Sequence, residues 1–160
     1  MLHLTVGCMF SGKTTALIRD TTIHPGLVID YHIGNHRTTL RNHDNTTVPC
    51  ITASNLLDVD VSNVTYIYIN EAQFFPELVY FVKEMLRLQK HVYVYGLDGD
   101  FKQEKFGSIL DLIPFSDTYT KLYAECTNCR NRASFSKRLT INNEQFAPHD
   151  VYIPVCRSCL

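Results

Sequence analysis

The residues with the clearest chemical potential lie near the start of the chain, between Gly7 and Thr14. They match the phosphate-binding pattern G-x-x-x-x-G-K-[ST] without a mismatch. The glycines let backbone N–H groups surround phosphate oxygens, while Lys13 is expected to reach the β- and γ-phosphates and Thr14 to offer its hydroxyl to Mg²⁺. The sequence therefore predicts a nucleoside triphosphate site made of Gly7, Cys8, Met9, Phe10, Ser11, Gly12, Lys13 and Thr14.

Four cysteines near the end of the chain form two CxxC pairs, which are Cys126 with Cys129 and Cys156 with Cys159. Each pair can present two thiolates on one face, and two pairs complete a tetrahedral shell suited to Zn²⁺. Four protein ligands leave no open position, so we expect a structural zinc. The ion would tie together the ends of residues 130–155, which could then lie over the active site as a lid. A redox pair and disulfides remain alternatives.

Short apolar strands are expected to position these residues. They are rich in Val, Ile, Leu and Tyr, as buried parallel strands are. Because strands alternate with helices, we expect an α/β fold with a P-loop (RecA-like) parallel sheet. The predicted strands are Leu2–Val6, Gly26–Tyr31, Val64–Ile69 and His91–Tyr95, with a shorter one around Pro49–Thr52.

Other segments have equally clear patterns. Pro76–Gln89 predicts a helix with Pro76 in its first turn and with one apolar face. The polar segment Gly34–Thr47 is typical of a mobile loop. The composition changes near Leu122, so we expect a nucleotide-binding domain over residues 1–122 and a small zinc-binding lasso, or lid, over 123–160. The apolar face of the helix consists of Leu78, Phe81, Val82, Met85 and Leu86.

The composition argues against several kinds of protein. The 160 residues fit one main domain, and the formal net charge of -1 with no basic run argues against a nucleic-acid partner. No apolar run is long enough to cross a bilayer, and no signal peptide fits the first residues. We therefore expect a cytoplasmic protein without a membrane partner, in which thiols stay reduced.

A second nucleotide-binding motif ends the strand at Val64–Ile69. Such strands end in acidic residues, and the Asp expected to hold Mg²⁺ through water is Asn70 here, followed directly by Glu71. Asn can orient a metal-bound water more weakly than Asp, because it lacks the negative charge. We therefore expect weaker Mg²⁺ binding with activity kept, and tighter Mg²⁺ binding if Asp is restored at position 70.

At this point the chain strongly resembles the cytosolic, zinc-containing thymidine kinases. The order and spacing of the matching segments cover almost the entire chain. They are Gly7–Thr14, Glu71-Ala72-Gln73-Phe74-Phe75-Pro76, Leu97-Asp98-Gly99-Asp100-Phe101 with Phe106-Gly107, and Ser134-Phe135-Ser136-Lys137-Arg138-Leu139 between the cysteine pairs.

The resemblance implies transfer of the γ-phosphate of ATP to the 5′-hydroxyl of thymidine or deoxyuridine. Glu71 matches the general base, and Arg37 matches an arginine that contacts phosphate. Lys13 and Mg²⁺ would neutralise charge during the transfer. Asn70 and Gln73 would complete the ATP site, with Asn70 and Thr14 beside Mg²⁺. The resemblance also implies a homotetramer and feedback inhibition by thymidine triphosphate.

The resemblance further implies an apolar pocket for the pyrimidine. Ser136 matches a position beside the base, and Tyr152 matches a tyrosine near the sugar. The lid backbone would hydrogen-bond the base edge through Asn143, Glu144, Gln145, Phe146 and Ala147. The pocket itself would be formed by Met9, Phe74, Leu97, Phe101 and Phe106.

The chain departs from the family pattern at one more place, and two alternative functions remain open. Ala147-Pro148 stands where the family usually has Gly-Gly, so we expect a stiffer lid hinge. Asn70 leaves open a catalytically impaired homologue that binds nucleosides or nucleotides. A small zinc-ribbon P-loop ATPase acting on nucleic acid is the other alternative.

Overall fold

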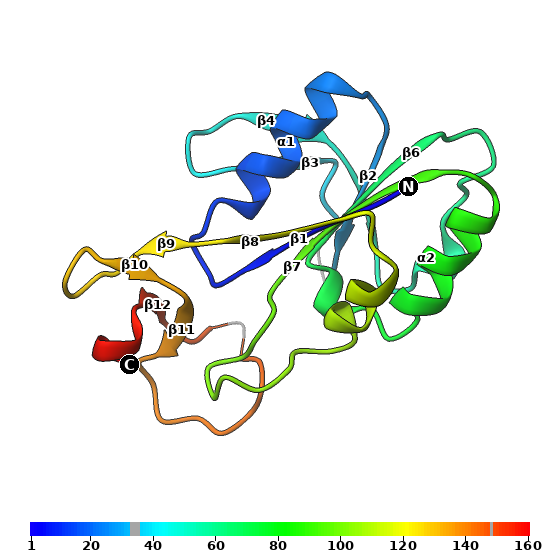
Figure 1. Ribbon diagram of the computed structural model, residues 1–160. Coiled ribbons are helices and arrows are strands. Elements are labelled where there is room, and N and C mark those ends of the chain that lie inside the picture. Colours follow the sequence, from blue (N-terminus) through cyan, green and yellow to red (C-terminus); the bar gives the residue numbers. More distant parts are fainter. Residues whose placement is uncertain (33–35, 148) are drawn as a thin grey trace.

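A six-stranded parallel sheet forms the centre of the computed structural model, which describes residues 1–32, 36–147 and 149–160 (Figure 1). Its strand order is β5-β2-β6-β7-β1-β8, and every neighbouring pair is parallel. The predicted α/β fold is confirmed, and the four main strands lie within two residues of their expected bounds. The strands are β1 (Leu2–Gly7), β2 (Leu27–Tyr31), β5 (Ile51–Ala53), β6 (Tyr66–Asn70), β7 (His91–Gly96) and β8 (Thr118–Leu122).

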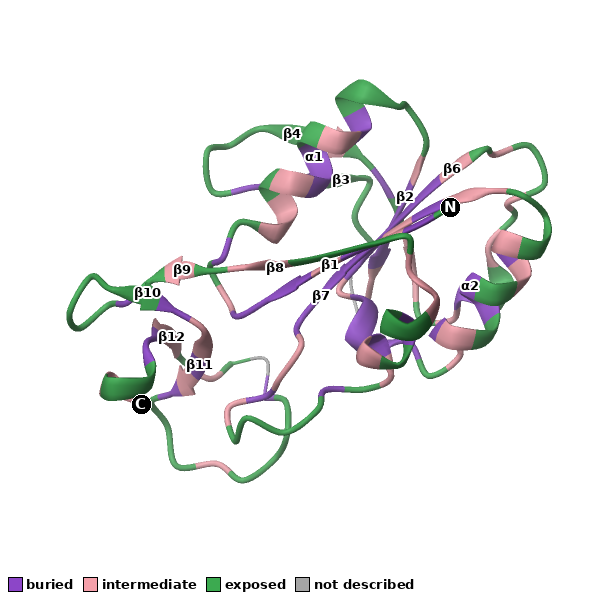
Figure 2. Cartoon of the chain, in the orientation of Figure 1, coloured by how far each residue is buried: buried purple, intermediate pink, exposed green. Residues whose placement is uncertain are grey.

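Helices cover both faces of this sheet. On one face, α1 (Lys13–Ile23) packs Leu17 and Ile18 into a cluster with Val28 and Tyr68. On the other, α2 (Leu78–Arg87) and the 3₁₀ helix η3 (Ile109–Phe115) pack against β1, β6 and β7. Figure 2 shows the result, with buried residues concentrated along the central strands. The carboxyl ends of the strands are thereby held in a rigid edge.

Helix α2 is shorter than predicted. Pro76 lies outside it, because the N–H of Leu78 bonds to the Phe75 carbonyl in a tight turn that precedes the helix. At the other end, Gln89 has a φ of 58°, a left-handed conformation that stops helix propagation. The predicted apolar face is confirmed, with Leu86 only partly buried and the other four residues buried.

The prediction of a plain loop over Gly34–Thr47 is wrong for its second half. Strands β3 (Thr39–Arg41) and β4 (Thr47–Pro49) form an antiparallel hairpin there. Leu40 anchors it by packing into the cluster beneath α1, and the Asn42 amide donates to the Thr15 hydroxyl. A single buried apolar residue thus outweighs the polar composition. Residues 33–35, at the start of the predicted loop, lie outside the described part of the chain.

The remaining differences concern strands at the sheet edges. The expected strand Pro49–Thr52 is divided at Cys50, so β4 ends at Pro49 in the hairpin and β5 starts at Ile51 in the main sheet. Strand β8 was not predicted, because its sequence is mostly polar and its first three residues are exposed. Edge strands carry such sequences, since only one side of the strand is covered.

The chain after β8 forms two small antiparallel ladders. β9 (Ala124–Glu125) pairs with β10 (Arg132–Ala133), and β11 (Phe135–Arg138) pairs with β12 (Tyr152–Val155). Their core is small and includes two of the cysteines. The short 3₁₀ helices are η1 (Leu56–Asp58), η2 (Ala72–Phe74) and η4 (Arg157–Cys159).

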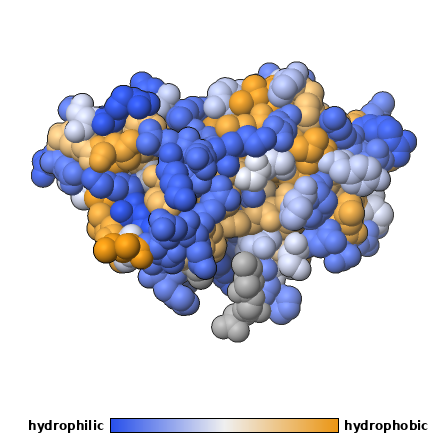
Figure 3. Space-filling view, turned by 90° about the horizontal axis from the view of Figure 1, so that it is seen from below, coloured by the Kyte–Doolittle hydropathy of each residue, from blue (hydrophilic) through white to orange (hydrophobic). Residues whose placement is uncertain are grey.

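The molecular surface is mixed. Hydrophilic and apolar side chains are interspersed on the face seen in Figure 3. Among the described residues, no helix is long and apolar enough to cross a membrane.

Candidate functional site

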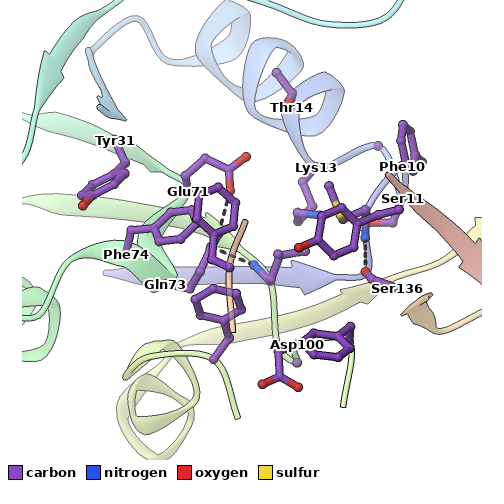
Figure 4. A pocket seen from close by; sticks show the side chains of 18 of the residues that line it. Phe10, Ser11, Lys13, Thr14, Tyr31, Glu71, Gln73, Phe74, Asp100 and Ser136 are labelled. Atoms are coloured by element: carbon purple, nitrogen blue, oxygen red, sulfur yellow. Dashed lines mark hydrogen bonds between the residues drawn. The ribbon is translucent and has the colours of Figure 1, made fainter. Parts of the chain in front are cut away.

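A cavity of about 670 Å³ opens where the phosphate loop and the carboxyl ends of the central strands meet the lid residues Gln145, Phe146 and His149 (Figure 4). In a parallel sheet, the carboxyl edge is where ligands bind. The volume is in the range of small-molecule sites.

The phosphate loop is shaped by glycines at its two ends. A Cβ on Gly7 would approach the Leu122 carbonyl oxygen to 2.6 Å, so no larger residue fits. Gly12 has a φ of 85° and caps α1, a conformation that favours glycine. The N–H groups of the first turn of α1 are therefore directed at the cavity, ready for phosphate oxygens.

Lys13 reaches across this loop. Its Nζ donates to the carbonyl oxygens of Gly7 and Cys8 at 3.1 and 2.7 Å. Burial lowers the pKa of the Lys13 ammonium from its ordinary value, and the negative charge of Glu71 opposes that shift. The side chain occupies the centre of the loop, with Thr14 above it at the start of α1 (Figure 4).

Glu71 is held in place by its backbone and by a neighbour. It follows β6 directly and has a left-handed backbone with φ 51°, which is unusual for a residue with a Cβ. The Gln73 amide donates to Glu71 Oε2 at 2.7 Å and accepts from the Leu97 N–H at 2.9 Å. Gln73 is buried, so it fixes the carboxylate that points into the cavity (Figure 4).

Aromatic rings form the apolar wall. The Phe74 ring stacks on Tyr31 with centroids 4.9 Å apart, and packs edge-on against Phe106 and Phe146 at 5.2 and 4.6 Å. A planar base would find apolar faces and edges here. Tyr31 and Phe74 lie beside Glu71 in Figure 4.

The lid contacts the main sheet domain through polar side chains. The Met9 N–H donates to Ser136 Oγ at 2.9 Å, which joins β11 to the phosphate loop. The Gln145 amide donates to Asp100 Oδ2 at 2.9 Å, and Lys102 Nζ donates to the Asn143 carbonyl at 3.3 Å. These bonds hold the lid against the phosphate loop and the segment after β7.

Arg138 organises the inside of the lid. Its side chain is 1% exposed and forms an ion pair with Asp150 at 3.1 Å. The guanidinium also donates to the Tyr152 hydroxyl and lies 3.9 Å from the centre of the Phe101 ring. It donates further to the carbonyl oxygens of Asn142, Glu144 and Gln145. The lid backbone is therefore wrapped around one buried cation.

Arg37 and Asn70 both contact Asp30, but only Arg37 lines the cavity. Arg37 lines the cavity and reaches Asp30 at the end of β2, with 3.7 Å between Nη2 and Oδ2. Asn70 does not line the cavity, and its amide donates to Asp30 Oδ1 at 2.7 Å. Asp30 was not expected at this edge from the sequence.

The four cysteines of the CxxC pairs converge. Their sulfur atoms all lie within 4.8 Å of one another, and Cys129 Sγ is 3.5 Å from Cys156 Sγ. Tetrahedral zinc with Zn–S bonds of about 2.3 Å places its sulfurs about 3.8 Å apart. The donor set and its spacing fit zinc.

Most of the residues proposed from the sequence meet in the cavity. Those that do not line it are Gly7, Cys8, Asn70, Asn143, Glu144 and Ala147, although Asn143 and Glu144 contribute backbone oxygens to contacts described above. Pro148, part of the expected hinge, lies outside the described residues. The lining residues are Met9, Phe10, Ser11, Gly12, Lys13, Thr14, Arg37, Glu71, Gln73, Phe74, Leu97, Phe101, Phe106, Ser136, Gln145, Phe146 and Tyr152.

Several lining residues were missed from the sequence. Tyr31 and Asp100 are the main ones, and Thr15, His43, Gly99 and His149 complete the set. The position of Tyr31 at the carboxyl end of a predicted parallel strand was the available signal. Asp100 lies within one of the motifs but was given no role.

Comparison with known proteins points to one family. The family model described as thymidine kinase matches residues 1–160. A thymidine kinase of Oryza sativa subsp. japonica is 40% identical, over 98% of this chain and 64% of that protein, so the chain spans less than two thirds of that relative. Thymidine kinases of Myxoma virus (strain Uriarra) and Vaccinia virus (strain Western Reserve) are 38% and 39% identical, over 99% of this chain and 94% and 95% of those proteins.

Proposed function

The chain belongs to the thymidine kinase family, and on that premise we propose that it transfers the γ-phosphate of ATP to the 5′-hydroxyl of thymidine or deoxyuridine. The observation that carries this proposal is the single cavity lined by both Lys13 and Glu71, with the aromatic wall beside them. A triphosphate on the loop and a nucleoside against Phe74 would then meet at Glu71.

Glu71 is proposed as the general base. Its carboxylate takes the proton of the 5′-hydroxyl as the oxygen bonds to the γ-phosphorus, while the bond to the β-phosphate oxygen breaks and ADP leaves. Gln73 keeps Glu71 oriented during this step. Lys13 turns from the loop carbonyls to the phosphates, and Arg37 contacts the phosphate being transferred.

The nucleotide side is proposed to include Mg²⁺, with Thr14 and Asn70 beside it. Bound Mg²⁺ would neutralise the charge that builds up on the β- and γ-phosphates. Gly7 to Thr14 would hold the triphosphate. Gln73 and Asn70 complete this half of the site.

The nucleoside side is proposed to combine the aromatic wall with the lid. Ser136 lies beside the base, Tyr152 near the sugar, and the backbone of residues 143–147 along the base edge. A closed pocket of this kind would reject purines by size. Met9, Leu97, Phe101 and Phe106 complete the apolar surface around Phe74.

A structural zinc ion on Cys126, Cys129, Cys156 and Cys159 is part of the proposal. Its support is the convergence of four sulfur atoms on a unit with a very small core. The ion would hold residues 123–160 as a lid domain on a nucleotide-binding domain of residues 1–122.

The family further suggests a homotetramer that acts in the cytoplasm and is inhibited by thymidine triphosphate. The triphosphate would occupy the nucleoside pocket and extend its phosphates toward Lys13. Light scattering of the zinc-loaded protein would test the assembly, and thymidine titrations with and without thymidine triphosphate would test the inhibition.

A coupled assay of ADP release tests the reaction itself. Thymidine should stimulate release strongly, and Glu71→Gln should lose most of the stimulation while still binding ATP. Release that depends on DNA and ignores thymidine would support the ATPase alternative. Nucleoside binding without any ADP release would support the impaired homologue. No described contact favours either alternative.

A further inference from the structure

Asp30 and Asn70 form a buried pair near the carboxyl ends of β2 and β6, and each directly precedes a cavity-lining residue, Tyr31 and Glu71 respectively. Strands β2 and β6 run in parallel with these two residues directly opposite each other. The Asn70 amide donates to Asp30 Oδ1 at 2.7 Å, and the two residues are 1% and 5% exposed. The carboxylate of Asp30 on β2 therefore lies directly beside Asn70 on β6, the position where the second nucleotide-binding motif usually has Asp.

The second carboxylate oxygen of Asp30 differs from the first in having no hydrogen-bond donor among the described residues. This oxygen, Oδ2, is buried. Within the described part of the chain, the cation paired with Oδ2 is Arg37, 3.7 Å away, whose side chain is 62% exposed and lines the cavity. A buried carboxylate oxygen without a donor is costly unless a ligand, a metal ion or water satisfies it.

We infer that Asp30 supplies the carboxylate of the magnesium–nucleotide site, and that Asn70 is the hydrogen-bond donor that orients it. Mg²⁺ prefers carboxylate oxygens, reached directly or through its own waters. Thr14 and Arg37 line the cavity and Asp30 lies just behind it, with its Oδ2 3.7 Å from Arg37 Nη2. The inference deepens the proposed kinase function and rests on it.

This arrangement reverses the expectation for position 70. In Asn70→Asp, the donor to Asp30 Oδ1 disappears and two carboxylates face each other at a buried site, where like charges repel strongly. Metal binding should therefore weaken rather than tighten. Exchanging the two residues, as Asp30→Asn with Asn70→Asp, restores one carboxylate with one amide donor, because the pair is in register across the strands.

Mn²⁺ titrations followed by electron paramagnetic resonance test the inference directly. The zinc-loaded protein is saturated with a non-hydrolysable ATP analogue, and the Kd for Mn²⁺ is compared among variants. We expect at least a tenfold increase in Asp30→Asn and in Asn70→Asp, and recovery to within about threefold of the wild type in the exchange variant. Asp20→Asn is the matched control, because Asp20 is a carboxylate on α1 bonded to Tyr95, and it should bind Mn²⁺ as the wild type does.

Melting temperature and zinc content establish that each variant is folded. An unchanged Mn²⁺ Kd in folded Asp30→Asn overturns the inference, as does tighter Mn²⁺ binding in folded Asn70→Asp. If Asp30→Asn does not fold, Asn70→Asp decides: weaker Mn²⁺ binding supports the inference and unchanged or tighter binding overturns it. A wild-type protein that binds Mn²⁺ as expected but lacks thymidine-stimulated ADP release would refute the proposed function and not the metal assignment.

Discussion

Gln73 fixes Glu71 through a 2.7 Å hydrogen bond between its amide nitrogen and the carboxylate. The same side chain accepts from the Leu97 N–H at the end of β7. One buried amide thus connects the proposed base to the strand that runs between β6 and β1.

Replacing Gln73 with Met should separate orientation from binding. We expect kcat to fall about 10- to 100-fold with little change in KM for thymidine, because a misplaced base costs rate rather than affinity. The unpaired Leu97 N–H should also cost about 1–3 kcal/mol of stability. Steady-state kinetics and denaturant titration measure both effects. Gln89→Met, at an exposed position, is the control, and a Gln73→Met enzyme with wild-type kcat would refute the orienting role.

Arg138 should control nucleoside affinity through the lid. Arg138→Met removes the donor shared by three lid carbonyls and the Tyr152 hydroxyl. Each lost bond to a charged group is worth roughly 1.5–3 kcal/mol, so KM for thymidine should rise at least tenfold. KM for ATP should change little.

Lys137→Gln is the matched comparison, since the neighbouring Lys137 bonds to the carbonyls of Cys159 and Leu160 instead. Equal rises in the KM values of both substrates would argue that Arg138 supports the fold generally rather than the lid.

Removal of the zinc site should open the lid while leaving the sheet folded. Cys159→Ser is expected to lower zinc content, thymidine affinity and the melting temperature, because the unit around it has little apolar core. Far-ultraviolet circular dichroism should stay close to that of the wild type. Cys50→Ser alters a cysteine outside the cluster and should keep its zinc. Full zinc content in Cys159→Ser would contradict the four-cysteine site.

His3 should make stability depend on pH. Its ring stacks on Tyr93 with centroids 4.3 Å apart, and burial lowers its pKa below the ordinary 6.5, while Asp117 opposes the shift. The unfolded chain then binds more protons than the native one, so stability is full above pH 6.5 and is lost as the pH falls through the lowered pKa.

Urea titrations between about pH 5 and pH 8 check this dependence. The His3→Asn variant should show a shallower fall in the free energy of unfolding at low pH. An identical slope in the two proteins would mean that other groups set the acid limit.

The sequence predicts the parts of the molecule that depend on local pattern. The central strands are buried on both faces and therefore read as apolar runs, and the phosphate loop is defined by its own glycines, Lys13 and Thr14. Strand β8 and the hairpin around Leu40 were missed, because edge and surface elements carry polar sequences. Cys126, Cys129, Cys156 and Cys159 were correctly expected to meet, since their spacing encodes two metal-binding turns.

The role of Asp30 follows only from pairing between distant strands. Asp30 lies near the end of a predicted strand, but the sequence does not show which residue of another strand it contacts, and the notable feature of Asn70 is the lack of a charge. Their parallel register places the two side chains together. The place of Tyr31 at the end of the same strand indicated the edge where ligands bind, but its stacking on Phe74 depends on a different element and could not be predicted.

The hydrogen bond from the Met9 N–H to Ser136 connects the phosphate loop, where the triphosphate would bind, to the lid, where the nucleoside would bind. Closing the lid on a nucleoside and shaping the loop around a triphosphate adjust the same pair of residues. By linkage, any factor by which ATP alters the affinity for thymidine must equal the factor by which thymidine alters the affinity for ATP. The order in which the substrates arrive then changes the path to the ternary complex without changing its final population.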